Sequence, residues 1–548
     1  MSDTLAGLLT IGVLVAALAA SHVPLGGYLA RVYTSERDWR VERWVYRGVG
    51  VDPRKEQPWK VYAASLGALS VFGFVALFLL ILVQGWLPFH HGEAMHVDTA
   101  FNTAVSFVTN TNWQSYAGEA GTSQAVQALG LTVQNFVSAA MGIAVVVALI
   151  RGFARHQTSL LGNFWVDLVR TVIRVLLPFS FVAAILLVLG GVIQNLAAPI
   201  AVTGVSGVPQ VIPGGLVASQ EAIKEFGTNG GGFFNANSAH PFENPNALTN
   251  LFQIFLLLVI PFTLPRVYGL MVGDRRQGHA ITAFMATLLG VSVVLVTWSE
   301  VAAGSGIAGS MEGKETRFGV WASSLFAAAT TATSTGAVNS MHESYSAPGG
   351  GVLLLNMMLG EISPGGTGSG LYGALVVAVI AVFIAGLMVG RTPEFLGKTI
   401  GRHEITLGAL YTLVTPALVL VFAGAAIVLP VSRAGMLASG PHGLTEMVYA
   451  FTSAANNNGS AFAGLTADQP YLNITLAVAM ALGRFVPMVL VLSLAGRLAT
   501  QKRRPVNAGT MPTHTPLFVV LLVSVALVVT GLTYFPTLAL GPIAEALR

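Results

Sequence analysis

The segment from Phe226 to Asn246 reads FGTNGGGFFNANSAHPFENPN. The part of the chain that contains it opens with a stretch of helical character too short to cross a bilayer, and a long apolar run follows. Between the two, glycine, asparagine, threonine and serine dominate. Irregular polar backbone of this kind is tolerated at membrane depth only where protein encloses it or water lies beside it. The segment therefore predicts a loop held inside a bundle of membrane helices.

The composition requires lipid as the solvent for most of the surface. Of the 548 residues, 54% are hydrophobic and 9% are charged, whereas a soluble protein carries roughly a quarter of its residues as charges. The net charge is +4, but the 28 Lys and Arg are spread along the chain and form no stripe that could follow a nucleic-acid backbone. The absence of cysteine excludes disulfides and cysteine-ligated metals. We therefore expect an integral membrane protein that does not bind nucleic acid.

Apolar runs of about 20 residues are needed to cross the hydrocarbon core of a bilayer, and the sequence contains ten. We place them near residues 4–21, 62–87, 128–150, 172–194, 251–272, 281–303, 351–390, 406–430, 472–497 and 515–537. The first run lacks the basic N-region and the cleavage site of a signal peptide, so we expect it to remain as a transmembrane helix.

The basic residues predict the orientation. Of the 28 Lys and Arg, 22 lie in alternate loops or at the ends of the adjoining spans, and eight of these fall between the first and second spans. By the positive-inside rule these loops face the cytoplasm. Because the number of spans is even, both termini are then expected outside.

Three more polar strips occupy the same position between two apolar runs. They read TNTNWQSY from Thr109 (the first strip), TTATSTGAVNSMHES from Thr330 (the third strip) and FTSAANNNGSAFAGL from Phe451 (the fourth strip). The segment quoted above is the second strip. The intervals between strips are 119, 106 and 122 residues, measured between Asn110, Asn229, Thr335 and Asn457. Four diverged copies of one unit explain this spacing, and the period exceeds that of solenoid repeats, so we expect a closed pseudo-fourfold ring.

The predicted fold is therefore all-α, with ten transmembrane helices forming four helix–pore loop–helix repeats and one extra helix at each end. The expected division is an N-terminal helix (1–30), four pore repeats (61–170, 171–279, 280–400 and 401–504) and a C-terminal helix (505–548).

The strips have the composition of a potassium site. Potassium sheds its water only where oxygens replace the hydration shell, and backbone carbonyls aimed at one axis do this. Glycine permits backbone angles that a side chain forbids, while Ser, Thr and Asn add oxygens or tie the loop to its surroundings. A preceding short helix directs its negative C-terminal end at the ion. The alternative is four surface loops rich in turn residues, but their equivalent positions argue against it.

Three stretches resemble a known family: GTNGGGFFNANSAHPFENPN (Gly227–Asn246), TNTNWQSY (Thr109–Tyr116) and SAANNNGSAF (Ser453–Phe462). They are similar to the potassium-binding A subunit of the bacterial Kdp potassium-transporting ATPase, which is related to the Trk and Ktr transporters. The resemblance extends essentially from end to end, including ten spans with both termini outside. It implies a subunit in the bacterial inner membrane that binds external potassium. The ion then passes through a tunnel to a P-type ATPase subunit (KdpB), which uses ATP, and KdpC and a small KdpF peptide complete the complex.

The resemblance also implies the residues of a selectivity filter. They are Asn110, Thr111, Asn112 and Gln114 from the first strip, Thr228, Asn229, Gly230 and Asn237 from the second, Ser334, Thr335 and Gly336 from the third, and Asn457, Asn458 and Gly459 from the fourth. The third repeat of the family often has a cysteine where this chain has Thr335, which keeps an oxygen ligand but puts the tuning of the site in doubt. The sequence contains no DKTG phosphorylation motif, so we expect this chain itself to be non-catalytic.

Two features are expected beneath the filter. The seventh span is interrupted by GEISPGGTGSG (Gly360–Gly370, the break), where a proline and five glycines prevent a regular helix. The break is either a passive link between two short helices or, as in the family, a gate formed around Gly365, Gly366, Thr367 and Gly368. Arg484 is a lone basic residue deep in a span, where charges usually face a cavity or a partner. It is either an electrostatic barrier to cations or one half of an ion pair, with Glu361 as the candidate partner.

Other interpretations remain open. A stand-alone channel or a Ktr-type transporter would use the same pore, and the second strip favours the Kdp subunit over it. A non-transporting membrane scaffold leaves the four polar strips unexplained. His90, His91 and His96 precede the first pore helix, and we expect a solvated loop there rather than a metal site.

Overall fold

The computed structural model describes residues 3–87, 94–304, 310–390, 392–505 and 510–548, so His90 and His91 lie outside the described residues. Within these ranges ten helices are long and apolar enough to cross a membrane, which confirms the predicted number of spans. They are α1 (Asp3–Thr34), α3 (Trp59–Leu82), η2 with α6 (Val126–Leu131, Thr132–Ala154), α7–η3–α8 (Phe164–Arg170, Thr171–Leu176, Leu177–Leu189), α10 (Ala247–Met271), α11 (Arg275–Ala303), α14 (Ser369–Met388), α15 (Arg402–Val428), α18 (Pro470–Thr500) and α19–η6–α20 (Pro516–Leu538, Ala539–Ile543, Ala544–Ala546).

The long helices differ in what surrounds them. α6 is buried along nearly its whole length, from Ser138 to Phe153, as expected for a helix that is apolar on every face and lies inside a bundle. By contrast, Phe72 on α3, Phe181 on α8 and Leu532 on α19 are each more than half exposed. With no polar belt to cover them, these apolar side chains form the surface that faces lipid.

Four shorter helices each lie between two long ones along the chain. They are α4 (Val97–Val108), α9 (Val217–Phe226), α12 (Gly319–Ala332) and α17 (Gly440–Asn456), and a polar strip begins directly after α4 and within the last two turns of each of the others. The order long, short, long therefore occurs four times, with α1 packed along α10 and α19 packed against α11 and α14 as extra helices. The boundaries between repeats remain our division of the chain.

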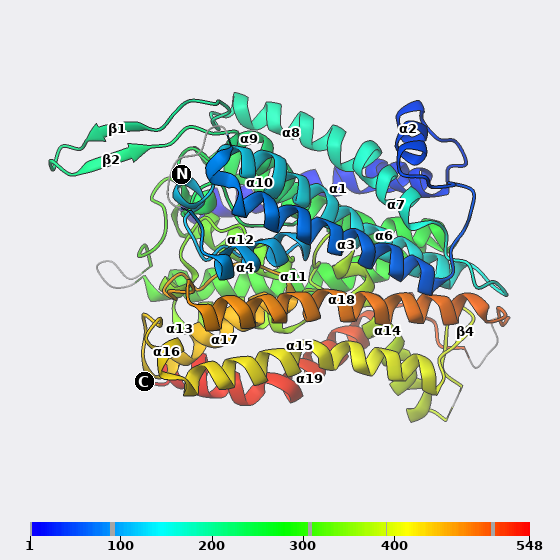
Figure 1. Ribbon diagram of the computed structural model, residues 1–548. Coiled ribbons are helices and arrows are strands. Elements are labelled where there is room, and N and C mark those ends of the chain that lie inside the picture. Colours follow the sequence, from blue (N-terminus) through cyan, green and yellow to red (C-terminus); the bar gives the residue numbers. More distant parts are fainter. Residues whose placement is uncertain (1–2, 88–93, 305–309, 391, 506–509) are drawn as a thin grey trace.

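The seventh span is divided as predicted. α13 (Ala347–Met358) precedes the break and α14 follows it, because the glycines and the proline cannot continue a helix. α14 runs from the middle of the bundle toward the end that carries strand β4 (Figure 1).

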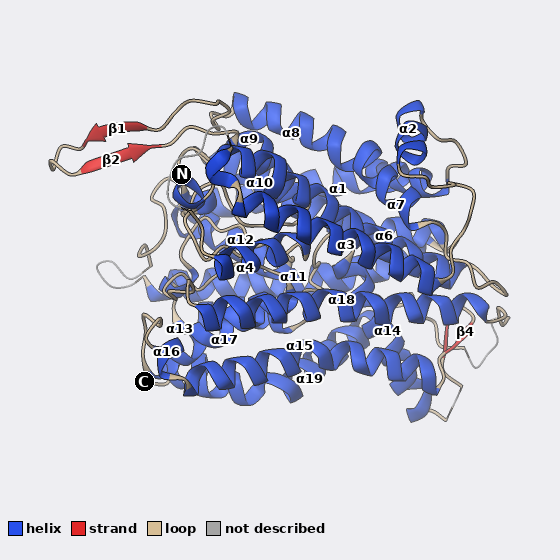
Figure 2. Cartoon of the chain, in the orientation of Figure 1, coloured by secondary structure: helices blue, strands red, loops and turns tan. Residues whose placement is uncertain are grey.

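Both termini lie at the same end of the bundle, and the four short helices lie in that half (Figure 1). A two-stranded hairpin of β1 (Ile200–Thr203) and β2 (Pro209–Ile212) projects from this end (Figure 2). α2 (Arg40–Gly48) and the short pair β3 (Glu394–Phe395) and β4 (Lys398–Thr399) lie at the other end (Figure 1). The remaining elements are η1 (Gln84–Trp86), α5 (Gly118–Gly121), η4 (Asn237–Ala239), η5 (His342–Ser344) and α16 (Pro430–Arg433).

Candidate functional site

Three of the four strips begin with the same backbone turn. Asn110, Thr228 and Asn457 have φ angles of 68°, 47° and 62°. In each case the next residue donates its N–H to the carbonyl five residues before it. These bonds join Thr111 to Ser106 (3.0 Å), Asn229 to Lys224 (2.9 Å) and Asn458 to Ser453 (2.9 Å). A left-handed residue with this bond closes the C-terminus of a helix. The pore helices α4, α9 and α17 therefore end in the same cap.

This cap fixes the register between the strips. The equivalent of Asn110 in the second strip is Thr228. The interval measured above from Asn110 to Asn229 is therefore one residue too long. The sets of filter residues expected from the resemblance are in register, since Asn112, Gly230 and Gly459 stand two residues after each cap. All three again have positive φ, at 57°, 90° and 97°. Successive carbonyls of a regular strand point to opposite sides, and a positive φ at every second residue lets them face the same side.

Backbone contacts close the four strips into a ring. A Cβ added at Gly230 would overlap the backbone of Gly336, with Gly336 Cα at 2.5 Å. One added at Gly336 would lie 2.6 Å from the carbonyl carbon of Gly459, and one added at Gly459 would overlap the carbonyl of Thr111. The first and second strips are joined by the Asn110 side chain, whose Nδ2 donates to the Thr228 carbonyl (2.9 Å). The ring predicted from the spacing is therefore closed.

Asparagine side chains hold the ring from behind. The Asn110 Oδ1 accepts from Asn229 Nδ2 (2.6 Å) and from the hydroxyl of Ser138 on α6 (2.8 Å). Asn112 Nδ2 donates to Asn135 Oδ1, also on α6 (2.5 Å). In the fourth strip, Asn457 Nδ2 donates to the Thr111 hydroxyl (3.0 Å). Because these amide nitrogens are used as ties between strips and helices, the backbone carbonyls remain available to an ion. Among the described residues, the buried Oδ1 atoms of Asn112 and Asn229 also accept no hydrogen bond.

The third strip is held differently. None of its residues from Thr333 to Ala337, all within the described chain, has a positive φ. The last carbonyl of α12, at Ala332, accepts a hydrogen bond from the N–H of Gly365 in the break (2.9 Å). Asn458 Nδ2 donates to the carbonyls of Thr330 (3.0 Å) and Thr333 (2.8 Å). The orphan carbonyls at this helix end are thus satisfied by the break and the fourth strip rather than by a cap of their own.

The break packs directly against the ring. The N–H of Thr367 donates to the hydroxyl of Thr228 (2.8 Å), and its own hydroxyl donates to the Gly227 carbonyl (2.9 Å). A side chain on Gly366 would overlap Ser334, and one on Gly368 would overlap the Gly142 carbonyl on α6. Residues from Glu361 to Gly368 are all buried. The expected gate residues therefore fill the space beside the second and third strips, on the side from which α14 leaves.

Thr228 carries backbone strain at this contact. A β-branched residue at φ 47° is a conformational outlier that costs about 1–3 kcal/mol and persists only where its surroundings enforce it. Here the cap of α9 and the two hydrogen bonds with Thr367 enforce it. The backbone of Thr228 is therefore fixed by the cap of α9 and by the break together.

Arg484 lies beside a cavity beneath the fourth strip. The cavity, of about 90 Å³, is enclosed by the break, the fourth strip, α15, α18 and α19, and both Glu361 and Arg484 line it. Arg484 is buried, and its Nη2 donates to the Ser138 carbonyl (3.4 Å). Within the described chain, no carboxylate lies within 4.0 Å of its guanidinium. The direct ion pair with Glu361, one of the two alternatives for Arg484, is not formed, and the Glu361 Oε1 accepts instead from Asn458 Nδ2 (2.9 Å).

With this geometry established, comparison with known proteins identifies the family. Residues 12–547 match the family described as "Potassium-transporting ATPase A subunit". The chain belongs to this family. Relatives named "Potassium-transporting ATPase potassium-binding subunit" are 57% identical in Kineococcus radiotolerans (100% of this chain, 99% of the relative) and 59% identical in both Clavibacter michiganensis and Streptomyces coelicolor (100% of each chain).

A solved structure supports the fold. The potassium transporter TrkH from Vibrio parahaemolyticus aligns with a TM-score of 0.50 at 16% sequence identity, covering 76% of this chain and 83% of TrkH. At this identity the similarity concerns the fold alone. It agrees with the four helix–pore loop–helix repeats in this member of the A-subunit family.

The side chains of two expected filter residues, Gln114 and Asn237, form hydrogen bonds with the backbone of the second strip. Gln114 accepts through Oε1 from the N–H of Gly232 (2.9 Å). Asn237 donates through Nδ2 to the Gly231 carbonyl and accepts through Oδ1 from Lys224 Nζ (2.9 Å). Both side chains therefore hold backbone groups of the second-strip glycines.

Sequence reasoning missed two groups of residues. Asn135 and Ser138 on α6 tie the first two strips to a membrane helix, and polar residues in an otherwise apolar span were the available signal. Lys224 Nζ and Glu243 Oε2 lie 3.6 Å apart, next to the second strip. Their positions in a polar outer segment gave no sign that they are buried.

Proposed function

We propose that this chain is the potassium-binding and translocating subunit of an ATP-driven, high-affinity potassium uptake complex. In this proposal it binds external potassium in the ring of four strips and passes the ion, within the membrane, to a P-type ATPase subunit that hydrolyses ATP. One observation carries the proposal: the closed ring, in which three of four strips have alternating positive φ, lies directly against the buried break. The names of the relatives agree with it.

The physical basis of binding is the replacement of water. Four strips that direct carbonyls toward one axis offer a dehydrated potassium ion a shell of oxygens. The C-terminal ends of α4, α9, α12 and α17 meet at the strips, and the negative end of each helix dipole favours a cation there. Selection and affinity thus come from backbone geometry, which the asparagine ties and the glycine contacts hold in place.

The path beyond the ring is set by the break and by Arg484. In our proposal the break closes the direct route to the cytoplasm as a gate. The cavity between the break, α15, α18 and α19 then offers the ion a sideways route toward the partner. Arg484, with no carboxylate within 4.0 Å among the described residues, raises the electrostatic cost of a cation continuing through this subunit.

The remaining elements of the proposal follow the family. The partners are the ATPase subunit (KdpB), KdpC and the small KdpF peptide, and the site is the bacterial inner membrane with both termini outside. ATP is used by the partner, so this chain contributes ion binding and not catalysis. The orientation is supported by the basic loops, since α2 and β4 lie at the end of the bundle opposite the termini (Figure 1).

The test is potassium-stimulated ATP hydrolysis by the assembled complex, measured with and without this chain. We expect the ATPase subunit to copurify and its hydrolysis to depend on potassium only when this chain is present. A stand-alone Trk- or Ktr-type transporter predicts potassium flux through the isolated chain and no copurifying ATPase, and that result would overturn the proposal.

A further inference from the structure

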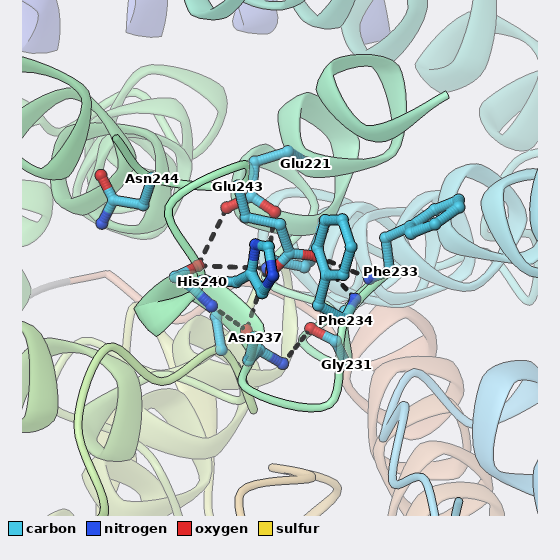
Figure 3. A network of polar contacts seen from close by, with 12 residues as sticks. Glu221, Gly231, Phe233, Phe234, Asn237, His240, Glu243 and Asn244 are labelled. Carbon is cyan, nitrogen blue, oxygen red and sulfur yellow. Dashed lines mark hydrogen bonds and ion pairs between the residues drawn. The ribbon is translucent and has the colours of Figure 1, made fainter. Parts of the chain in front are cut away.

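A cluster of charged side chains is buried behind the second strip. Glu221, Lys224 and Glu225 on α9 and Glu243 near the end of the strip are all within 1% of full burial. Lys224 Nζ lies 2.6 Å from Glu221, 3.7 Å from Glu225 and 3.6 Å from Glu243. Figure 3 shows Glu221 and Glu243 converging on one point from the helix and from the loop that returns to it.

The cluster is unusual in its charge. One buried ammonium group faces three buried carboxyl groups, and buried charges are costly unless paired and hydrogen-bonded. Arg317 approaches the same loop but donates to the carbonyls of Asn244 and Ala239 and pairs with Glu315 (2.5 Å). Lys224 is therefore the cation on which the three glutamates converge. Removing one partner from such a group leaves another unsatisfied.

Two chains of hydrogen bonds run from this cluster to the glycines of the second strip. Lys224 Nζ donates to Asn237 Oδ1 (2.9 Å), and Asn237 Nδ2 donates to the Gly231 carbonyl. Glu243 Oε1 accepts from the N–H groups of Phe233 (2.6 Å) and Phe234 (3.2 Å). Figure 3 shows the bond from Asn237 to Gly231 and the bonds from Phe233 and Phe234 to Glu243. The turn from Gly231 to Phe234 is thus tied at one end to Lys224 through Asn237. At the other end it is tied to the carboxyl group of Glu243.

The second strip needs such support more than the others do. Three consecutive glycines follow Asn229, and glycine has the largest backbone freedom to lose. Gly230 contacts Gly336 across the ring, so a shift of the glycines changes the spacing of the carbonyls. We propose that Lys224 and Glu243 are positioning residues that set ion selectivity by holding these glycines in place, an inference that rests on the proposed function of the ring.

The chain contains a matched control pair. Lys314 Nζ and Glu300 Oε2 are 2.9 Å apart and both side chains are buried. Glu300 Oε1 accepts from the N–H of Ser346 (2.9 Å), beyond the end of the third strip. The Glu300 carboxylate therefore has the same kind of partners as that of Glu243, but it holds no filter glycine.

The experiment compares Glu243→Gln and Glu300→Gln in the full complex. Half-saturating concentrations of potassium and rubidium for ATP hydrolysis give a selectivity ratio for each variant. We expect Glu243→Gln to lower the preference for potassium by about 2- to 30-fold, the range for coupling through an intermediate network, and Glu300→Gln to keep the wild-type ratio. A folded Glu243→Gln complex with the wild-type ratio would overturn the inference for Glu243.

A second variant keeps the test decisive if Glu243→Gln does not assemble. Asn237→Asp is nearly isosteric and keeps the acceptor for Lys224, but it loses the donor to the Gly231 carbonyl. We expect a changed selectivity ratio in a complex of normal thermal stability, and an unchanged ratio would refute the lysine connection. Failure of the proposed function has a different signature, because the wild-type complex itself would then show no potassium-stimulated hydrolysis.

Discussion

The third strip is a loop of the same kind as the other three strips, but different contacts hold it in place. The first, second and fourth strips each begin with a left-handed residue that caps its own pore helix. The third has no such residue, and the end of its helix is bound by Gly365 of the break and by Asn458 of the fourth strip. Three strips are therefore positioned locally, whereas the third depends on a segment distant in the chain.

This difference suggests how selection and closure are combined. Because the break supplies a hydrogen bond that α12 lacks, any movement of the break also disturbs the third strip. The same segment binds Thr228 in the second strip. In our view, filter and gate in this repeat are one mechanical unit, while the first and fourth strips form the fixed part of the ring.

Removing the break should produce the largest effect. Deletion of Gly365–Gly368 takes away the contacts with Ala332, Ser334 and Gly142, and a filter selects ions without stopping them. We expect potassium current through reconstituted complexes of this variant in the absence of nucleotide, and little current through the wild-type complex under the same conditions. A passive link predicts poor folding or no change, so a well-folded deletion without leak would exclude a gate.

Neutralising Arg484 should have the next largest effect. A cation close to a fixed positive charge is opposed by about 1–4 kcal/mol, depending on the local dielectric, and Arg484→Gln removes this term while keeping much of the side chain's length. We expect ATP hydrolysis and potassium uptake to become uncoupled in a complex that still assembles.

The outcome for Arg484 distinguishes its two roles. Loss of assembly would favour a structural role through the Ser138 carbonyl, and normal coupling would exclude a barrier. Arg433→Gln, on the short helix α16 outside the spans, is the control for loss of one positive charge.

Substitutions of the ring glycines test the comparison directly. Gly230 has φ 90° and contacts Gly336, whereas Gly336 lacks a positive φ. Gly230→Ala therefore adds backbone strain of about 1–3 kcal/mol to the steric overlap, and Gly336→Ala adds the overlap alone. We expect potassium affinity to fall more for Gly230→Ala, and Gly230→Asp also to relax selectivity against rubidium. Equal affinities for the two alanine variants would show that left-handed backbone is not what distinguishes the second strip from the third.

The sequence predicted some of these features because they depend on composition. The ten spans follow from hydropathy, and the break from a proline among glycines. The interval to the second strip was measured from Asn229, one residue beyond the cap at Thr228. Spacing carries no record of φ, and the caps at Thr228 and Asn457 are defined by φ. Gln114 and Asn237 were expected in the filter from the resemblance, and their hydrogen bonds to the glycines of the second strip could be found only from three-dimensional contacts. Lys224 and Glu243 were missed, since charged residues in an outer segment normally face water.

The smallest expected effect is a dependence of potassium affinity on pH in the second strip. Burial raises the pKa of Glu243 to about 8, opposed by Lys224 and by the N–H groups of Phe233 and Phe234. Glu221 also raises it. Among the other groups around the carboxyl, Lys224 has a raised pKa and stays charged, while burial and Arg317 lower the pKa of His240 to about 4, so that it stays neutral. Between pH 7 and pH 9 Glu243 therefore gains a negative charge while these neighbours do not change.

A negative charge behind the second strip favours a cation in the ring, so potassium binding and proton release are linked, and the linkage is reciprocal. Raising the pH through about 8 should strengthen potassium binding by about two- to tenfold, the effect of one charge close to the ring. Glu243→Gln should remove this dependence on pH. Burial also raises the pKa of Glu225. Within the described chain the Glu225 carboxylate accepts from the Ser238 hydroxyl and from no N–H of the strip, so Glu225→Gln is the matched control. The half-saturating concentration of potassium, measured from pH 6.5 to 9 for each variant, decides whether Glu243 or Glu225 is responsible. A pH step that survives Glu243→Gln and disappears in Glu225→Gln would assign the linkage to α9 instead of the loop, and a flat profile in the wild-type complex would show that the charge of Glu243 is not transmitted to the ring.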